Sequence, residues 1–124
     1  MTKRVLIVED ETNIVESLSF LLGRAGFEVQ TVADGALALD KAAHVEPDVM
    51  ILDVMLPNVS GFDVLRGVRA NPALTSTPVM MLTAKGQSRD REQALQLGAD
   101  VFVTKPFSNA DIVAEARRLA GLDG

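Results

Sequence analysis

Short apolar runs alternate along this chain with longer segments whose apolar residues follow helical spacing. We expect five of the runs to be β-strands: Arg4 to Val8, Glu28 to Val32, Val49 to Asp53, Val79 to Leu82 and Val101 to Val103. Four of them are nearly continuous in Val, Ile, Leu and Met, which is typical of strands that helices cover on both faces. The alternation therefore predicts a parallel sheet.

Five helices are expected between and after these strands. The first has Ile14, Leu18, Leu21 and Leu22 on one face and ends at Gly23 and Gly26. The next three are Ala36 to Ala43 after Asp34-Gly35, Ser60 to about Asn71, and Ser88 to Leu97. The last begins at Ser108 and has Ile112, Ala116, Leu119 and Ala120 on one face. The third and fifth begin with Ser-x-x-Asp, a helix start signal. Right-handed crossovers turn this pattern into a doubly wound, three-layer α/β sandwich of the flavodoxin-like (βα)5 type.

Composition narrows the class of protein further. A chain of 124 residues with 48% hydrophobic residues fits one domain, which we place at residues 1–124. The absence of cysteine excludes disulfides and thiolate chemistry. The first apolar run is too short for a signal peptide, and the net charge of −5 disfavours direct binding to nucleic acid or to an anionic membrane. We therefore expect a soluble cytoplasmic protein.

Chemically useful side chains follow several of the predicted strands. They are Glu9-Asp10-Glu11 after the first strand, Asp53 at the end of the third, Thr83-Ala84 after the fourth and Thr104-Lys105-Pro106 after the fifth. Ligands of doubly wound folds bind outside the carboxyl ends of the strands, so these side chains are expected to meet. Crowded carboxylates raise one another's pKa, and a hard divalent cation resolves the conflict. The pattern predicts a Mg²⁺ site with Asp10 and Asp53 as direct ligands, Glu9 nearby and the Met55 backbone carbonyl as a further oxygen.

Asp53 is the candidate nucleophile. A carboxylate that ends a buried strand beside a metal can attack phosphorus, as in aspartyl-phosphate chemistry. Lys105 could pair with Asp53 or with a phosphoryl oxygen, and Thr83 could donate its hydroxyl to the same oxygens. The simpler alternatives are a solvated helix entry for Glu9 and Asp10, a turn-capping Asp53 and a surface Lys105. The isomer of the Lys105-Pro106 peptide bond stays open.

These residues resemble the receiver domain of two-component response regulators. The resemblance runs from Lys3 to about Leu122. It is carried by four motifs in order, which are Val5 to Glu11, Asp48 to Pro57 with Ser60-Gly61-Phe62, Pro78 to Ala84, and Gly98-Ala99-Asp100 through Lys105-Pro106-Phe107. Any one of these motifs is weak, but four at the expected intervals are specific.

The resemblance implies a phospho-acceptor switch. Asp53 would accept a phosphoryl group from a histidine kinase, a phosphotransfer protein or a small phosphodonor, and the domain would catalyse only its own phosphorylation and dephosphorylation. Asp10, Glu9, Asp53 and the Met55 carbonyl would hold Mg²⁺, whereas Thr83, Ala84 and Lys105 would contact the phosphoryl group.

Signal output is also implied by the resemblance. Thr83 would move toward the phosphoryl group, and Phe102 would turn inward to fill the vacated space; ordinary packing is the alternative for Phe102. The output face would be the fourth helix, fifth strand and fifth helix, presented to a downstream effector or to an output domain outside this chain. Met55 is expected to hinder the attacking water, and Lys85 to attract phosphodonors.

Three other functions fit parts of the pattern. A receiver-like scaffold without phosphorylation would have lost the acids, the Thr or the Lys, all of which are present. A haloacid-dehalogenase-type phosphatase would carry Asp-x-Asp where this chain has Asp53-Val54-Met55. A flavin-binding protein would need a phosphate loop after the first strand. The single histidine, His44, is expected at the surface, and the methionines mainly in the core.

Overall fold

The computed structural model describes residues 2–84 and 88–122. Five strands and five helices alternate: β1 (Arg4–Val8), α1 (Thr12–Arg24), β2 (Glu28–Val32), α2 (Gly35–Val45), β3 (Val49–Asp53), α3 (Gly61–Ala70), β4 (Val79–Thr83), α4 (Ser88–Gln96), β5 (Val101–Thr104) and α5 (Asn109–Leu119). The predicted order of elements is confirmed. β4 and β5 each extend one residue beyond the prediction, because Thr83 pairs with Thr104 at the end of the ladder.

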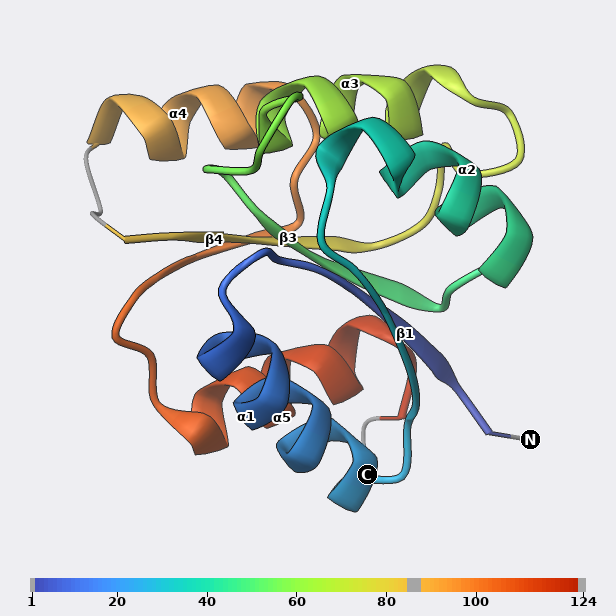
Figure 1. Ribbon diagram of the computed structural model, residues 1–124, viewed down its shortest axis with the longest axis vertical. Coiled ribbons are helices and arrows are strands. Elements are labelled where there is room, and N and C mark those ends of the chain that lie inside the picture. The colour runs from blue at the N-terminus through green and yellow to red at the C-terminus, as the bar shows by residue number, and fades with distance from the viewer. Residues whose placement is uncertain (1, 85–87, 123–124) are drawn as a thin grey trace.

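The strands form one parallel sheet in the order β2-β1-β3-β4-β5. Helices α1 and α5 lie on one side of it, and α2, α3 and α4 lie on the other (Figure 1). The doubly wound three-layer fold is thus confirmed. Strand order reverses where β1 lies between β2 and β3, so the crevice in which such folds bind ligands lies at the carboxyl ends of β1 and β3.

Side chains of the central strands alternate between two apolar cores. Leu6, Met50 and Leu52 belong to the core under α2, α3 and α4, whereas Ile7 and Ile51 belong to the core under α1 and α5. All five are fully buried, as continuous apolar strands covered on both faces require. The central strands are therefore covered from both sides, and their carboxyl ends lie together at one edge of the sheet.

The predicted helix start signals form real caps. The Ser60 hydroxyl accepts from the Asp63 N–H, and the Ser108 hydroxyl accepts from the Asp111 N–H, both at 3.3 Å. Each satisfies an N–H at a helix start that has no partner within the helix. His44 is exposed, as expected.

Most of the described methionines lie in the core, as expected. Met50, Met80 and Met81 are fully buried, but Met55 is 72% exposed. Met55 follows the end of β3, where the chain leaves the sheet, so neither helical layer covers its side chain. No helix in the described part of the chain is long and apolar enough to cross a membrane.

Arg69 joins three segments at the sheet edge opposite the crevice. From the end of α3 its guanidinium donates to the Gly98 carbonyl at 2.6 and 3.0 Å and to the Thr77 carbonyl at 2.6 Å. It also pairs with the Asp100 carboxylate at 3.1 Å. The segment before β4 and the segment between α4 and β5 are thereby fixed to α3.

Candidate functional site

Three carboxylates meet at the carboxyl ends of β1 and β3. One carboxylate oxygen from each of Glu9, Asp10 and Asp53 lies within 4.8 Å of the others. Glu9 and Asp53 are buried, with residue exposures of 1% and 2%, whereas Asp10 is exposed. The structure thus brings together the predicted acids, and Glu9 is not part of a solvated helix entry.

Lys105 lies among these acids. Its ammonium nitrogen is 2.9 Å from Glu9 Oε1, 3.5 Å from Asp53 Oδ2 and 3.6 Å from Glu11 Oε1, and its side chain is 11% exposed. Its shortest contact is with Glu9, a partner that the sequence did not indicate. Lys105 is therefore a largely buried cation of the cluster and not a surface lysine. The Lys105-Pro106 peptide bond is cis.

Burial and pairing shift two pKa values at this site. Burial raises the pKa of Glu9, although hydrogen bonds from Lys105 and from the Glu11 backbone work in the opposite direction. For Lys105, burial alone would lower the pKa, but the hydrogen bond to Glu9 and the charges of Asp53, Glu9 and Glu11 outweigh it and raise the pKa. Lys105 is therefore held as an ammonium near neutral pH.

The loop after β3 fixes the position of Asp53. The Met55 N–H donates to Asp53 Oδ1 at 3.3 Å, and the Val54 N–H donates to the Leu82 carbonyl at 2.9 Å. The loop then turns back, and the Gly61 N–H donates to the Val54 carbonyl at 2.9 Å. Asp53 thus has one carboxylate oxygen near a backbone N–H and the other near Lys105.

A second loop is tied to this one by Asp34. Asp34 Oδ1 accepts from the Ala36 N–H, and Oδ2 accepts from the Asn58 side-chain amide, each at 2.8 Å. Asn58 has a left-handed backbone with φ 68°, which Asn tolerates better than most residues. One carboxylate therefore caps α2 and holds the tip of the β3–α3 loop.

Asp34→Ala is expected to lower the free energy of unfolding by about 1–2 kcal/mol, because it removes a helix cap and a side-chain hydrogen bond. Urea unfolding followed by circular dichroism would measure this. Asp40→Ala is the matched control, because Asp40 is a residue within α2 outside the cap, and its change should stay within about 0.5 kcal/mol. Equal effects of the two substitutions would show that the Asp34 contacts do not contribute.

The other predicted site residues lie on β4 and β5. Thr83 ends β4 and is buried, Ala84 follows it, and the Lys105 N–H donates to the Thr83 carbonyl at 2.6 Å. Phe102 is partly buried, and it lies opposite Met81 in the β4–β5 ladder. Lys85 falls outside the described residues.

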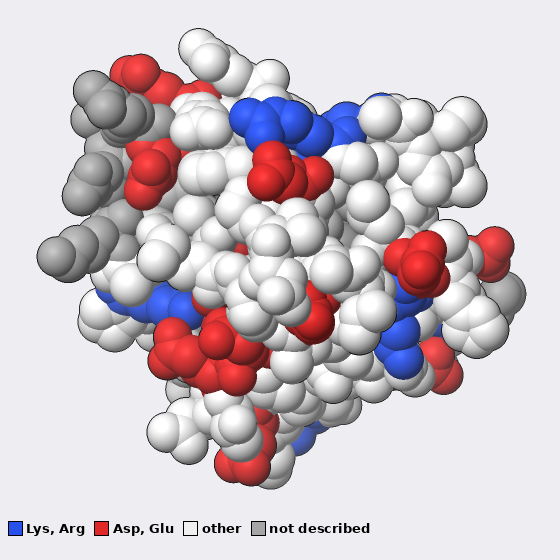
Figure 2. Space-filling view, turned by 45° about the horizontal axis from the view of Figure 1, so that its top comes forward, with Lys and Arg blue, Asp and Glu red and all other residues white. Residues whose placement is uncertain are grey.

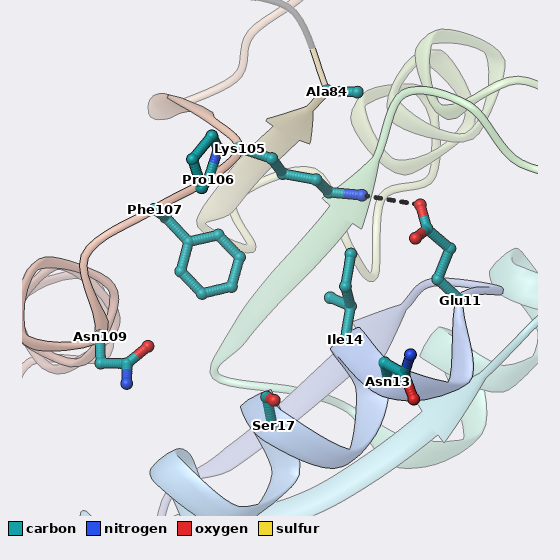
Figure 3. Close-up of a pocket in the computed structure, with 9 residues that line it drawn as sticks. All are labelled: Glu11, Asn13, Ile14, Ser17, Ala84, Lys105, Pro106, Phe107 and Asn109. Carbon is teal, nitrogen blue, oxygen red and sulfur yellow. Dashed lines mark ion pairs between the residues drawn. The ribbon is translucent and has the colours of Figure 1, made fainter.

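A cleft of about 540 Å³ adjoins the site. Figure 3 shows Glu11 at one side of the cleft with its carboxylate directed at Lys105, and Ile14 and Phe107 on the walls below. No role for Glu11 was predicted from the sequence. The available signal was a third acid in the run Glu9-Asp10-Glu11, placed just where the chain enters α1.

Surface charge on the face seen in Figure 2 is unevenly distributed. Acidic side chains gather in one larger cluster there, and basic side chains occur in small separate groups. The arrangement agrees with the net charge of −5. Among the described residues, this face offers no continuous basic surface of the kind that binds a nucleic-acid backbone.

Fold and site together define a doubly wound parallel α/β protein with an acidic cluster and a largely buried lysine ammonium at the point where strand order reverses. The family model of the response regulator receiver domain matches residues 5–117. The chain therefore belongs to the response regulator receiver domain family. Receiver domains are signalling switches of two-component systems, which interact with histidine kinases and effector domains. Membership argues against the phosphatase and flavin-binding alternatives.

Individual relatives agree with this assignment. The chain is 41% identical over 119 residues to the alkaline phosphatase synthesis transcriptional regulatory protein PhoP of Bacillus subtilis, covering 96% of this chain and 49% of that protein. It thus spans about half the length of the curated relatives that it matches.

Solved structures that resemble this chain agree with its assignment to the receiver domain family. A putative response regulator from Chloroflexus aurantiacus superposes with a TM-score of 0.93 at 31% identity, covering 98% of this chain and 99% of that one. The receiver domain of the sensor histidine kinase PA1611 from Pseudomonas aeruginosa superposes with a TM-score of 0.89 at 30% identity, covering 98% and 99%, and holds a magnesium ion in its active site cleft.

Proposed function

We propose that this domain accepts a phosphoryl group on Asp53 in a Mg²⁺-dependent reaction and thereby acts as a two-component signalling switch. The donor would be a histidine kinase or a phosphotransfer protein, with small phosphodonors as substitutes. The observation that carries the proposal is the position of Asp53, a buried carboxylate at the end of a central strand with two further acids and an ammonium around it.

The donor set suits Mg²⁺. Glu9, Asp10, Glu11 and Asp53 contribute four carboxylates and Lys105 one ammonium, so the cluster keeps an excess of negative charge that a divalent cation would offset. Carboxylate and carbonyl oxygens are the ligands that Mg²⁺ prefers. Asp10, Asp53 and the Met55 backbone carbonyl would hold the ion, with Glu9 beside them. When bound, the ion would supply positive charge to the oxygens of the transferring phosphoryl group.

The protein's own residues would position and neutralise the reactants. A carboxylate oxygen of Asp53 forms the new P–O bond while the donor's P–N bond breaks, and the electron pair leaves with the histidine ring nitrogen. Lys105, the Thr83 hydroxyl and the Ala84 backbone N–H would receive the phosphoryl oxygens. Catalysis by positioning and charge is the usual logic of phosphoryl transfer.

Output would follow from Thr83 and Phe102. Thr83 moving toward the phosphoryl group would leave space beside β5, and Phe102 would turn into it. Supporting this, both residues lie on neighbouring strands, and Phe102 is only partly buried. The face formed by α4, β5 and α5 would then change shape for an effector protein or an output domain.

The test is the intact mass of the protein after incubation with acetyl phosphate and Mg²⁺. We expect a gain of one phosphoryl group, which is lost with a chelator and in Asp53→Asn. Asp40→Asn, an aspartate on α2 away from the site, should gain the group normally. If no gain occurs and beryllofluoride also leaves the thermal stability unchanged, the phospho-acceptor function is wrong, and a receiver-like scaffold becomes the better description.

A further inference from the structure

The Lys105 ammonium is shared by three carboxylates, but only one of them is open to solvent. The side chains of Glu9 and Asp53 are 0% and 3% exposed, whereas that of Glu11 is 60% exposed and still lies 3.6 Å from the ammonium nitrogen. Glu11 and Asp53 thus both lie close to the same nitrogen, at 3.6 and 3.5 Å. Any group that comes from solvent to Asp53 and Lys105 approaches the Glu11 charge as well.

Local structure holds Glu11 in this place. Its N–H donates to Glu9 Oε2 at 3.1 Å, and its carbonyl accepts from the N–H groups of Ile14 and Val15 at 3.0 Å. Glu11 is the N-cap residue of α1, yet its side chain makes no capping hydrogen bond. The backbone is therefore fixed while the carboxylate reaches across the cleft to Lys105 (Figure 3).

We propose, on the basis of the phospho-acceptor function above, that Glu11 is a specificity-determining residue that disfavours small anionic phosphodonors. It does so in two ways. Its carboxylate repels a donor that carries negative charge into the cleft, and its ion pair competes with the incoming phosphoryl oxygens for Lys105. Both effects are Coulombic, so they grow with the charge of the donor and weaken with added salt.

A protein donor is affected less. A phosphoryl group carried on a docked protein is held at the site by contacts elsewhere in the interface, and these offset a local repulsion. A small donor has no such contacts. Glu11 would therefore favour phosphorylation by a docked protein over phosphorylation by free metabolites.

The test compares two small donors of different charge. Acetyl phosphate is a dianion near neutral pH, and phosphoramidate is a monoanion. With acetyl phosphate, the Asp53 carboxylate oxygen bonds to phosphorus while the bond to the acetate oxygen breaks, and acetate leaves with the electron pair. For Glu11→Gln we expect the second-order rate constant with acetyl phosphate to rise about three- to tenfold at low ionic strength, with a smaller rise for phosphoramidate.

Controls separate charge from structure. Glu16→Gln, an exposed glutamate further along α1, should leave both rates unchanged. The gain in Glu11→Gln should shrink as NaCl is added. No gain, or an equal and salt-independent gain with both donors, would overturn the inference while leaving the phospho-acceptor function intact. If neither the unmodified protein nor Glu11→Gln gains a phosphoryl group from either donor, the proposed function itself fails.

Discussion

Lys105→Met is expected to lower the free energy of unfolding by about 2–4 kcal/mol near neutral pH, measured in a chelator so that metal binding does not contribute. The substitution leaves Glu9 as a buried carboxylate without its cationic partner at 2.9 Å. Removing one partner of a buried pair is costly because the other charge stays desolvated. Glu9 would then become protonated more readily.

The loss should depend on pH in a defined direction. Burial already raises the pKa of Glu9 in the folded protein, and the Lys105 hydrogen bond opposes this rise, so its removal raises the pKa further. A raised folded-state pKa gives stability that is present below the unfolded pKa and lost as pH rises through the folded pKa. The deficit of Lys105→Met should therefore be small below the ordinary pKa of a glutamate, about 4.3, and grow as the pH rises above it. Lys105 itself titrates above this range, since its own pKa is also raised.

Urea unfolding at a series of pH values would measure this dependence. The double variant Glu9→Gln/Lys105→Met should recover much of the loss at neutral pH, because neither member of the pair then carries a buried charge. Lys41→Met, on α2 at the other end of the sheet, should change stability little at any pH. A deficit that stays constant across the pH range would show that packing of the lysine stem matters and the ion pair does not.

Gly61→Ala is expected to destabilise the fold by about 2–4 kcal/mol and to lower the rate of phosphorylation at Asp53. A Cβ at Gly61 would overlap the Asp53 carbonyl oxygen and would lie 2.9 Å from Val54 Cα. These are backbone atoms at the end of a central strand, so they cannot move aside as a flexible side chain would. Relief of the clash requires a shift of the residue that carries the reactive carboxylate.

Two other glycines provide matched controls for this substitution. Gly23 lies in α1, and a Cβ added there would meet nothing within 4 Å, so Gly23→Ala should be neutral or stabilise the helix by up to about 1 kcal/mol. Gly67→Ala would meet the Leu39 side chain, which can change rotamer, so an intermediate loss is expected. Thermal unfolding would rank the three glycine variants by stability, and the acetyl phosphate assay would rank them by rate of phosphorylation. A Gly61→Ala variant as stable as Gly23→Ala would contradict the prediction.

Much of the fold could be predicted because periodicity and burial agree along this chain. Val49 to Leu52 form a continuous apolar run, and they are buried on both faces of the sheet. Strand ends were harder to place, because the ladder continues through polar residues such as Thr83 and Thr104 that carry no apolar signal. The exposure of Met55 could not be predicted, since an apolar side chain next to a strand does not show whether a helix covers it.

The sequence indicated which residues lie near one another at the site, but it did not indicate which carboxylate Lys105 contacts most closely. Parallel strands place their carboxyl ends along one edge, which is enough to bring Asp10, Asp53 and Lys105 together. Glu9 is the shortest contact of Lys105 because of the rotamers of these two long side chains, and the spacing of residues in the sequence does not determine rotamers. Glu11 was expected among the side chains at this edge, but its contact with Lys105 was not predicted, because a carboxylate at a helix start has a common and simpler explanation.

Arg69 ties together the end of the sheet opposite the acidic cluster. Its guanidinium ties α3 to the carbonyls of Thr77 and Gly98 and to the Asp100 carboxylate. These anchor points lie just before β4 and β5, whereas Thr83 and Lys105 lie at the opposite ends of the same strands. A rearrangement around Thr83 and Lys105 therefore does not require the Arg69 contacts at the other end of β4 and β5 to break. Substitutions can change one end of these strands without changing the other.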